Sequence, residues 1–146
     1  MATRRPPPAA LHDSPDEVEA QFYEALAAGD LAKMMAVWAD DDEIVCVHPG
    51  GGRFIGPAAI RASFEVIFSG GGGPNLVPEQ VHRLHSLTCA VHHLTERIEA
   101  DGAQGWIFAT NVYVKTAQGW RLAAHHASAA EPQGLDSGAD APSTLH

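Results

Sequence analysis

GWRLAAHHAS, residues 119–128, is the stretch that decides the fold, and it directly follows a second strand-like stretch, WIFATNVYVK, residues 106–115. Successive side chains of a strand point to opposite faces, so only one of His125 and His126 can face the interior. Arg121 shares a face with His125. The more apolar face holds Trp120, Leu122, Ala124 and His126. We therefore expect His126 to face the interior, unless a β-bulge reverses the assignment.

The length of 146 residues and the hydrophobic fraction of 45% are typical of a single globular domain. No apolar run reaches membrane-spanning length. The net charge of −9, with no basic block, excludes nucleic acid and anionic membranes as expected partners. The N-terminus has no apolar segment typical of a signal peptide. Cys46 and Cys89 lie in apolar segments and are expected to be buried free thiols, which favours the cytoplasm.

The domain is predicted to span residues 14–130. Residues 1–13 are rich in Pro and Ala, and residues 131–146 are small, polar and punctuated by Pro and Gly, so both segments are predicted to be disordered tails. The first helix begins at Ser14, with Pro15 at its first position and Glu17 completing a capping box.

Two further helices are expected before the strands. The second begins after Asp30, and its apolar stripe is Leu31, Met34, Met35 and Trp38. The third begins at Gly56-Pro57. Short strands are predicted at residues 44–48 and 53–55, and long ones at 79–86, 89–100, 105–116 and 119–130. Helices followed by a run of strands predict an α+β fold with a curved antiparallel sheet.

Several segments together resemble the nuclear transport factor 2-like superfamily, and most closely its SnoaL-like branch. They are Phe22–Asp30 (FYEALAAGD), Val37–Asp40 (VWAD), Val47–Gly50 with Gly56–Arg61, Gly119–Leu122 and His126–Ser128. The resemblance implies a cone in which the curved sheet wraps around three N-terminal helices and leaves a pocket at its open end.

The resemblance does not carry over a catalytic set. Ketosteroid isomerase, a member of this superfamily, needs an Asp base and an acidic oxyanion hole, and the only acidic candidate for the inward face of the last three strands is Glu96. Scytalone dehydratase, another member, uses a His and an Asp with paired tyrosines, whereas this chain has only Tyr23 and Tyr113, with Asp30 as a helix cap.

The neighbours of His126 on the preceding strand depend on which face points inward. Alternation allows two sets, Ala109, Asn111 and Tyr113 or Phe108, Thr110 and Val112. The position of Asn111 resembles that of a pocket-facing arginine in the kinase association domain of the same superfamily. That resemblance favours Asn111 and Tyr113 inside.

The expected site combines His126 and His48 as catalytic groups, because imidazoles beside an apolar floor can supply acid–base chemistry near neutral pH. The residues expected to bind the ligand are Asn111, Tyr113, Trp38, Phe22 and Phe64. Among nine histidines there is no HxH or HxxxH element to hold two ligands, so we expect no metal site, with a three-histidine site as the open alternative. No cofactor is predicted.

The sequence therefore predicts a small-molecule-binding protein, of the lyase, isomerase or cyclase type, acting on an unknown apolar ligand. The alternative is a non-catalytic dimerisation or accessory domain with a vestigial pocket. A homodimer is expected through the convex sheet face. The residues expected on that face, too apolar for full exposure, are Ala123, Ala127 and either Ile107 or Phe108.

Overall fold

The computed structural model describes residues 12–100 and 102–130. Its helices are α1 (Pro15–Ala28), α2 (Leu31–Met35), α3 (Pro57–Ile67) and the short 3-10 helix η1 (Phe68–Gly70). Its strands are β1 (Val45–Val47), β2 (Arg53–Ile55), β3 (Leu76–His85), β4 (Cys89–Ala100), β5 (Ala103–Thr116) and β6 (Gly119–Ala129). The predicted α+β class and the three N-terminal helices are confirmed.

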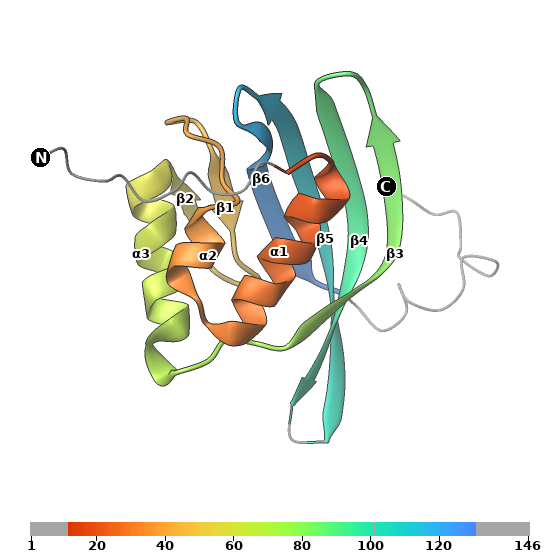
Figure 1. The fold of residues 1–146 in the computed structure, drawn as a ribbon. Coiled ribbons are helices and arrows are strands. Elements are labelled where there is room, and N and C mark those ends of the chain that lie inside the picture. Colours follow the sequence, from red (N-terminus) through yellow and green to blue (C-terminus); the bar gives the residue numbers. More distant parts are fainter. Residues whose placement is uncertain (1–11, 101, 131–146) are drawn as a thin grey trace, which may run out of the picture.

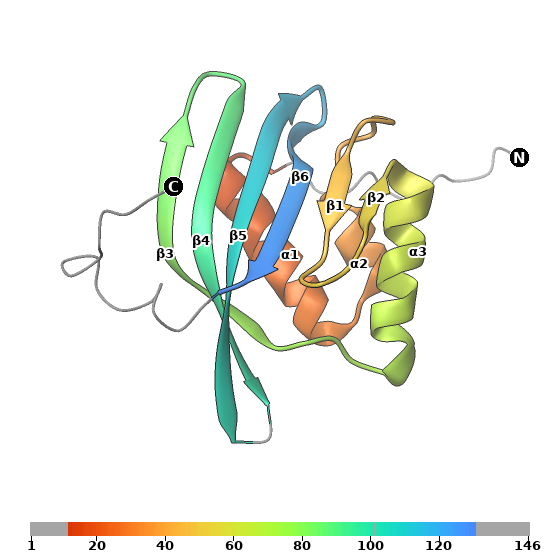
Figure 2. The same ribbon diagram turned by 180° about the vertical axis from the view of Figure 1, so that it is seen from behind.

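The strands form one six-stranded sheet in the order β2-β1-β6-β5-β4-β3. The four long strands are antiparallel neighbours and curve around α1, which lies along their inner face (Figure 1). Figure 2 shows the opposite, outer face of these strands, with α1 behind them and α3 to the side, next to β2. The sheet is not purely antiparallel, because β1 pairs with β6 in the parallel direction.

Helix α1 is fixed at both ends by the predicted signals. The Ser14 side chain accepts a hydrogen bond from the Glu17 backbone N–H at 3.2 Å, and Gly29 ends the helix in the left-handed conformation, with φ of 66°. Its buried stripe carries Phe22 with other apolar residues, but also Glu19 and Tyr23. The helix therefore places polar groups against the inner face of the sheet.

The apolar stripe predicted a second helix that reaches Trp38, but α2 ends at Met35. The following segment pairs with β6: the Leu122 N–H donates to the Val37 carbonyl and the Ala39 N–H to the Leu122 carbonyl, both at 2.8 Å. These bonds satisfy the backbone outside a helix. Trp38 is therefore a buried wall residue of an extended segment rather than of a helix.

A β-bulge in β6 reverses the predicted assignment of the two histidines. Val112 pairs with Ala124, and the next residue of β5, Tyr113, pairs with Leu122, so Ala123 is an extra residue. One extra residue swaps every later side chain to the opposite face. His125 is buried and His126 is exposed, so the expectation that His126 faces the interior is wrong.

The same register corrects the predicted outer face. Ala127 is buried on the inner face, in register with Ala109. Phe108, which is 40% exposed, points outward. The sequence had offered either Ile107 or Phe108 for the outer face. Phe108 lies on that face, whereas Ile107 packs against the core.

The predicted tails fall almost entirely on residues 1–11 and 131–146, which lie outside the described residues. Within residues 1–13, His12 is buried and pairs with Gly119, and its carbonyl accepts from the Trp120 N–H at 3.0 Å. Across residues 12–100 and 102–130, we find no helix with the length and apolar character to cross a membrane.

Candidate functional site

A pocket of about 360 Å³ opens between α1, α3 and the inner face of the sheet. Most of its wall is apolar, and three titratable side chains enter it. The lining residues are Phe22, Leu26, His48, Pro49, Phe64, Ile67, Pro74, Leu76, Glu96, Ile98, Ile107 and His125. An apolar cavity with a few convergent polar groups is the usual form of a small-molecule site.

Glu96 is the acidic group of this pocket. It lies on β4 with its side chain turned toward α1 and is only 1% exposed. Burial raises the pKa of Glu96 from 4.5 to about 7, because the charged carboxylate loses its hydration; the hydrogen bond from Tyr23 opposes this shift. The Tyr23 hydroxyl donates to Oε2 of Glu96 at 2.6 Å. The carboxyl group can therefore both take up and release a proton near neutral pH.

A chain of hydrogen bonds joins Glu96 to His125. The Asn111 side-chain nitrogen donates to the Tyr23 hydroxyl at 3.3 Å, and the Asn111 oxygen lies 2.6 Å from Nδ1 of His125. Since that oxygen can only accept, Nδ1 of His125 carries the proton and Nε2 keeps its lone pair. Burial, with smaller effects of His48 and His126, lowers the pKa of His125 to about 3, so the ring is neutral.

His48 enters the pocket from the end of β1. Its Nε2 lies 2.9 Å from the Ser63 hydroxyl on α3, whose proton goes to the Ile60 carbonyl at 2.7 Å. The hydroxyl oxygen therefore accepts from His48, which leaves Nδ1 of His48 as an acceptor. Burial lowers the pKa of His48 below its ordinary value. The two pocket histidines are thus both expected to be neutral at physiological pH.

The structure brings together only part of the predicted site. Three of the predicted site residues line the pocket, namely His48, Phe22 and Phe64. Asn111 lies behind His125 and holds its ring. His126, predicted as a catalytic group, is exposed on the outer face, since the bulge at Ala123 turned it away.

Two predicted ligand-binding residues lie elsewhere. Trp38 borders a separate surface groove with Met35 and Arg61, because the segment after α2 runs along β6. Tyr113 is fully buried on the inner face, where its hydroxyl donates to Glu19 at 3.0 Å, away from the pocket lining. Neither side chain is placed to contact a ligand in the pocket.

Sequence reasoning missed Tyr23 and His125 as functional groups. The signal for Tyr23 was available, since it follows Glu19 by four residues and both share the buried face of α1. Glu96 was identified as the acidic candidate, but not its link to Tyr23. The placement of His125 depends on the bulge at Ala123, which leaves no local mark in the sequence.

The arrangement can move a proton on a bound molecule. Glu96 can act as acid or base, and His125 and His48 offer neutral acceptors at the same apolar cavity. A second polar group, Asp16, Glu19 and His92, lies further toward the beginning of α1 and is a candidate for holding a metal ion.

Comparison with solved structures gives related proteins. A Thiobacillus denitrificans ATCC 25259 protein, provisionally described as a calcium/calmodulin-dependent protein kinase type II association domain, is 35% identical, with 83% of this chain and 98% of that chain covered and a TM-score of 0.77. A Streptomyces avermitilis protein of the NTF2-like family, provisionally described as a dehydratase, is 28% identical, with 80% and 93% covered and a TM-score of 0.71.

A Pseudomonas putida KT2440 NTF2-like protein of unknown function, 20% identical, shares the fold, with 84% of this chain and 89% of that chain covered and a TM-score of 0.70. The comparison with curated proteins gave no significant match. The family model described as the SnoaL-like domain matches residues 16–132. The chain therefore belongs to the SnoaL-like domain family, within the NTF2-like superfamily.

Proposed function

We propose that this protein binds a small, largely apolar molecule and catalyses proton transfer on it, as an isomerase or a dehydratase-type lyase. The observation that carries the proposal is Glu96, a buried carboxyl group at an apolar pocket with a pKa of about 7. A carboxyl group near half protonation can remove a proton from one atom and return it to another.

The substrate class follows from the lining of the pocket. Its walls are aliphatic and aromatic, and its polar end holds Glu96, His48 and His125. Among the residues that the structure describes, no Lys or Arg lines it. A carboxylate or phosphate group on the ligand would have no cation to pair with there. A neutral molecule with one polar group, such as a carbonyl or hydroxyl group facing the histidines, fits this lining.

The neutral His125 has a defined part in this proposal. Its Nδ1–H is held by Asn111, so Nε2 is free to accept a hydrogen bond from a hydroxyl group or to take a proton during elimination. The description of the Streptomyces avermitilis relative as a dehydratase supports this class of reaction.

The test uses 2-tetralone, a neutral bicyclic ketone with acidic protons beside its carbonyl group. The protein in D₂O is expected to accelerate exchange of these protons, followed by NMR, and Glu96→Gln is expected to abolish the acceleration. The control Glu65→Gln changes an exposed carboxylate on α3 and should leave the rate unchanged. Shifts of pocket resonances without exchange would support binding but contradict proton transfer, and no shifts would contradict both.

We propose self-association as a second function, favoured by a specific observation. The outer face of the sheet lies opposite the helices (Figure 2) and exposes Phe108 at 40% and Leu84 at 71%. The relative of 35% identity is described as an association domain, which supports a homodimer through this face. Both functions are compatible, since the pocket opens on the inner face.

We propose the cytoplasm as the compartment of the protein. Cys46 and Cys89 are both free thiols, and Cys46 is buried beside His48. Free cysteines are typical of reducing compartments. Fractionation of cells that express the tagged full-length chain tests this assignment, and recovery of the chain outside the cytoplasm would contradict it.

A further inference from the structure

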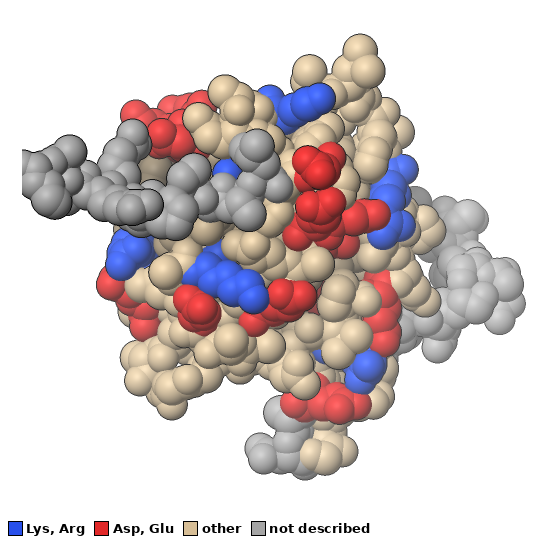
Figure 3. Space-filling view, in the orientation of Figure 1, with Lys and Arg blue, Asp and Glu red and all other residues tan. Residues whose placement is uncertain are grey.

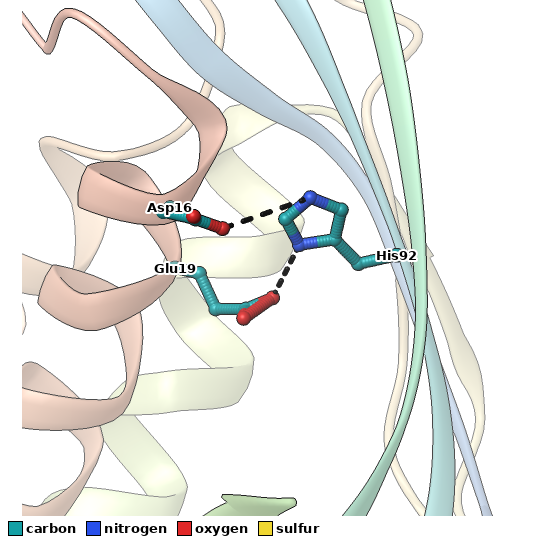
Figure 4. A group of neighbouring side chains, drawn as sticks. All are labelled: Asp16, Glu19 and His92. Atoms are coloured by element: carbon teal, nitrogen blue, oxygen red, sulfur yellow. Dashed lines mark hydrogen bonds and ion pairs between the residues drawn. The ribbon is translucent and has the colours of Figure 1, made fainter. Parts of the chain in front are cut away.

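A second cluster of chemically active side chains lies between the first turns of α1 and the middle of the sheet. Asp16 and Glu19 come from α1, three residues apart, and point toward His92 of β4 (Figure 4). One ligand atom from each of the three lies within 4.8 Å of the others. The pocket described above is lined by other residues of α1 and β4, so this cluster is a separate site.

His92 is held in one orientation and one tautomer. The residue is completely buried, and its Nδ1 lies 2.7 Å from Oε1 of Glu19, which also accepts from the Tyr113 hydroxyl at 3.0 Å. Since a carboxylate can only accept, Nδ1 of His92 carries a proton, and in the neutral ring Nε2 presents a lone pair. A carboxylate on the far nitrogen of an imidazole is the arrangement that orients histidine ligands in metal sites.

A second imidazole faces this lone pair. Nε2 of His85, at the exposed end of β3, lies 3.4 Å from Nε2 of His92. Two imidazole nitrogens on one tetrahedral Zn²⁺, each at about 2.0–2.1 Å, stand roughly 3.3 Å apart. The two rings are parallel within 4°, so a shared ion requires the exposed His85 ring to tilt toward it.

Asp16 supplies an oxygen near Nε2 of His92. Its Oδ1 lies 4.0 Å from Nε2 of His92 and accepts from Nε of Arg83 at 2.9 Å. An ion bound by Asp16 would share this carboxylate with Arg83. Acidic side chains gather over the beginning of α1, with basic side chains beside them (Figure 3). The guanidinium of Arg83 reduces the local negative charge, so the imidazoles are the main ligands.

We propose that His92, His85 and Asp16 form a binding site for a divalent transition-metal ion of the zinc type, with Glu19 orienting His92. Two imidazoles and one carboxylate select Zn²⁺, Co²⁺ or Ni²⁺ rather than Mg²⁺ or Ca²⁺, which prefer all-oxygen sets. The site links β3, β4 and α1, so an ion there ties the outer strand to the helix. This inference does not depend on the proposed proton transfer.

The experiment is titration of the purified full chain with Zn²⁺ by calorimetry, and with Co²⁺ followed by visible absorption. We expect one ion per chain and a tetrahedral Co²⁺ spectrum, with no heat for Mg²⁺ at the same concentration. His85→Ala and Asp16→Asn change exposed residues and should each weaken Zn²⁺ binding. Glu19→Gln should weaken it by about 10–100-fold through the loss of orientation.

The matched controls are His93→Ala and His82→Ala. These two exposed histidines form a cross-strand pair of β3 and β4, and His93 neighbours His92 on the opposite face of β4. Both variants should bind Zn²⁺ like the wild type. Loss of binding in His93→Ala with retention in His85→Ala would place the ion on the outer face and overturn the proposal. Absence of Zn²⁺ binding to the wild type would also overturn it.

Discussion

The hydroxyl group of Tyr23 lies 2.6 Å from Oε2 of Glu96, across the interface between α1 and β4. This bond joins two buried side chains that are 73 residues apart in the sequence. Tyr23 also accepts a hydrogen bond from Asn111, and Glu96 lines the pocket. It is the contact through which the helix adjusts the acidity of the pocket carboxyl group.

Tyr23→Phe should raise the pKa of Glu96 above about 7, because the hydroxyl now stabilises the charged carboxylate, and without it burial and the charge of Glu19 would act unopposed. The variant also leaves the Asn111 amide without its partner, so stability should fall by roughly 1–3 kcal/mol. NMR titration of the Glu96 side-chain carbonyl measures the shift.

Tyr113→Phe is the control for this titration, since Tyr113 bonds to Glu19 rather than to Glu96. It should move the Glu96 titration much less than Tyr23→Phe does. Equal shifts in the two variants would show that general burial, and not the Tyr23 bond, sets the acidity.

The pH dependence of stability should separate Glu96 from His125. The pKa of Glu96 is raised from 4.5 to about 7, so the folded state binds more protons than the unfolded one in this range. Stability from this group is present below pH 4.5 and is lost as the pH rises through 7. At 1.36 kcal/mol per unit, the loss is roughly 3 kcal/mol.

His125 acts in the opposite direction, because its pKa is lowered from 6.5 to about 3. Its stabilising contribution is present above pH 6.5 and is lost as the pH falls through 3. Between pH 4.5 and 6.5, the two groups therefore change the free energy of unfolding in opposite directions as the pH rises. Urea unfolding should show stability falling on acidification in Glu96→Gln, and falling on alkalinisation in His125→Gln. Identical profiles in both variants would contradict the assignments.

Trp38→Ala should destabilise the protein by roughly 3–5 kcal/mol, because a large aromatic side chain is removed from a wall between the segment after α2 and β6. Trp38 is only 5% exposed. Trp106→Ala, at a half-buried position of β5, should have a smaller effect. Chemical denaturation of both variants measures the difference. An unchanged midpoint for Trp38→Ala would contradict the prediction and mean that the Trp38 side chain does not contribute to the packing there.

The proposed homodimer makes Phe108 the residue to change. Phe108→Glu places a charge on the outer face of β5 and should shift the protein from dimer to monomer in light scattering at micromolar concentration. Leu87→Asp is the control, since Leu87 is 90% exposed in the turn between β3 and β4. A wild-type protein that is only monomeric would remove the proposal.

Most of the fold was predictable because its signals are local. The Ser14 cap, the stop at Gly29 and the turn at Gly119 each fix an element through the residues beside it. The site was less predictable because its geometry is not local. The bonds of Tyr23 and Glu19 run from α1 to β4, and the bulge at Ala123 is set by the pairing of two whole strands.

The neighbouring residues His125 and His126 test that bulge directly. His125→Ala should destabilise the protein by roughly 1–3 kcal/mol, because the buried Asn111 oxygen loses its donor at 2.6 Å and a small cavity opens beside Phe22. His126→Ala, one residue later and exposed, should change stability by less than about 0.5 kcal/mol. Urea denaturation of the pair measures the difference. A larger loss for His126→Ala would mean that β6 follows unbroken alternation in solution and that His126, not His125, faces the pocket.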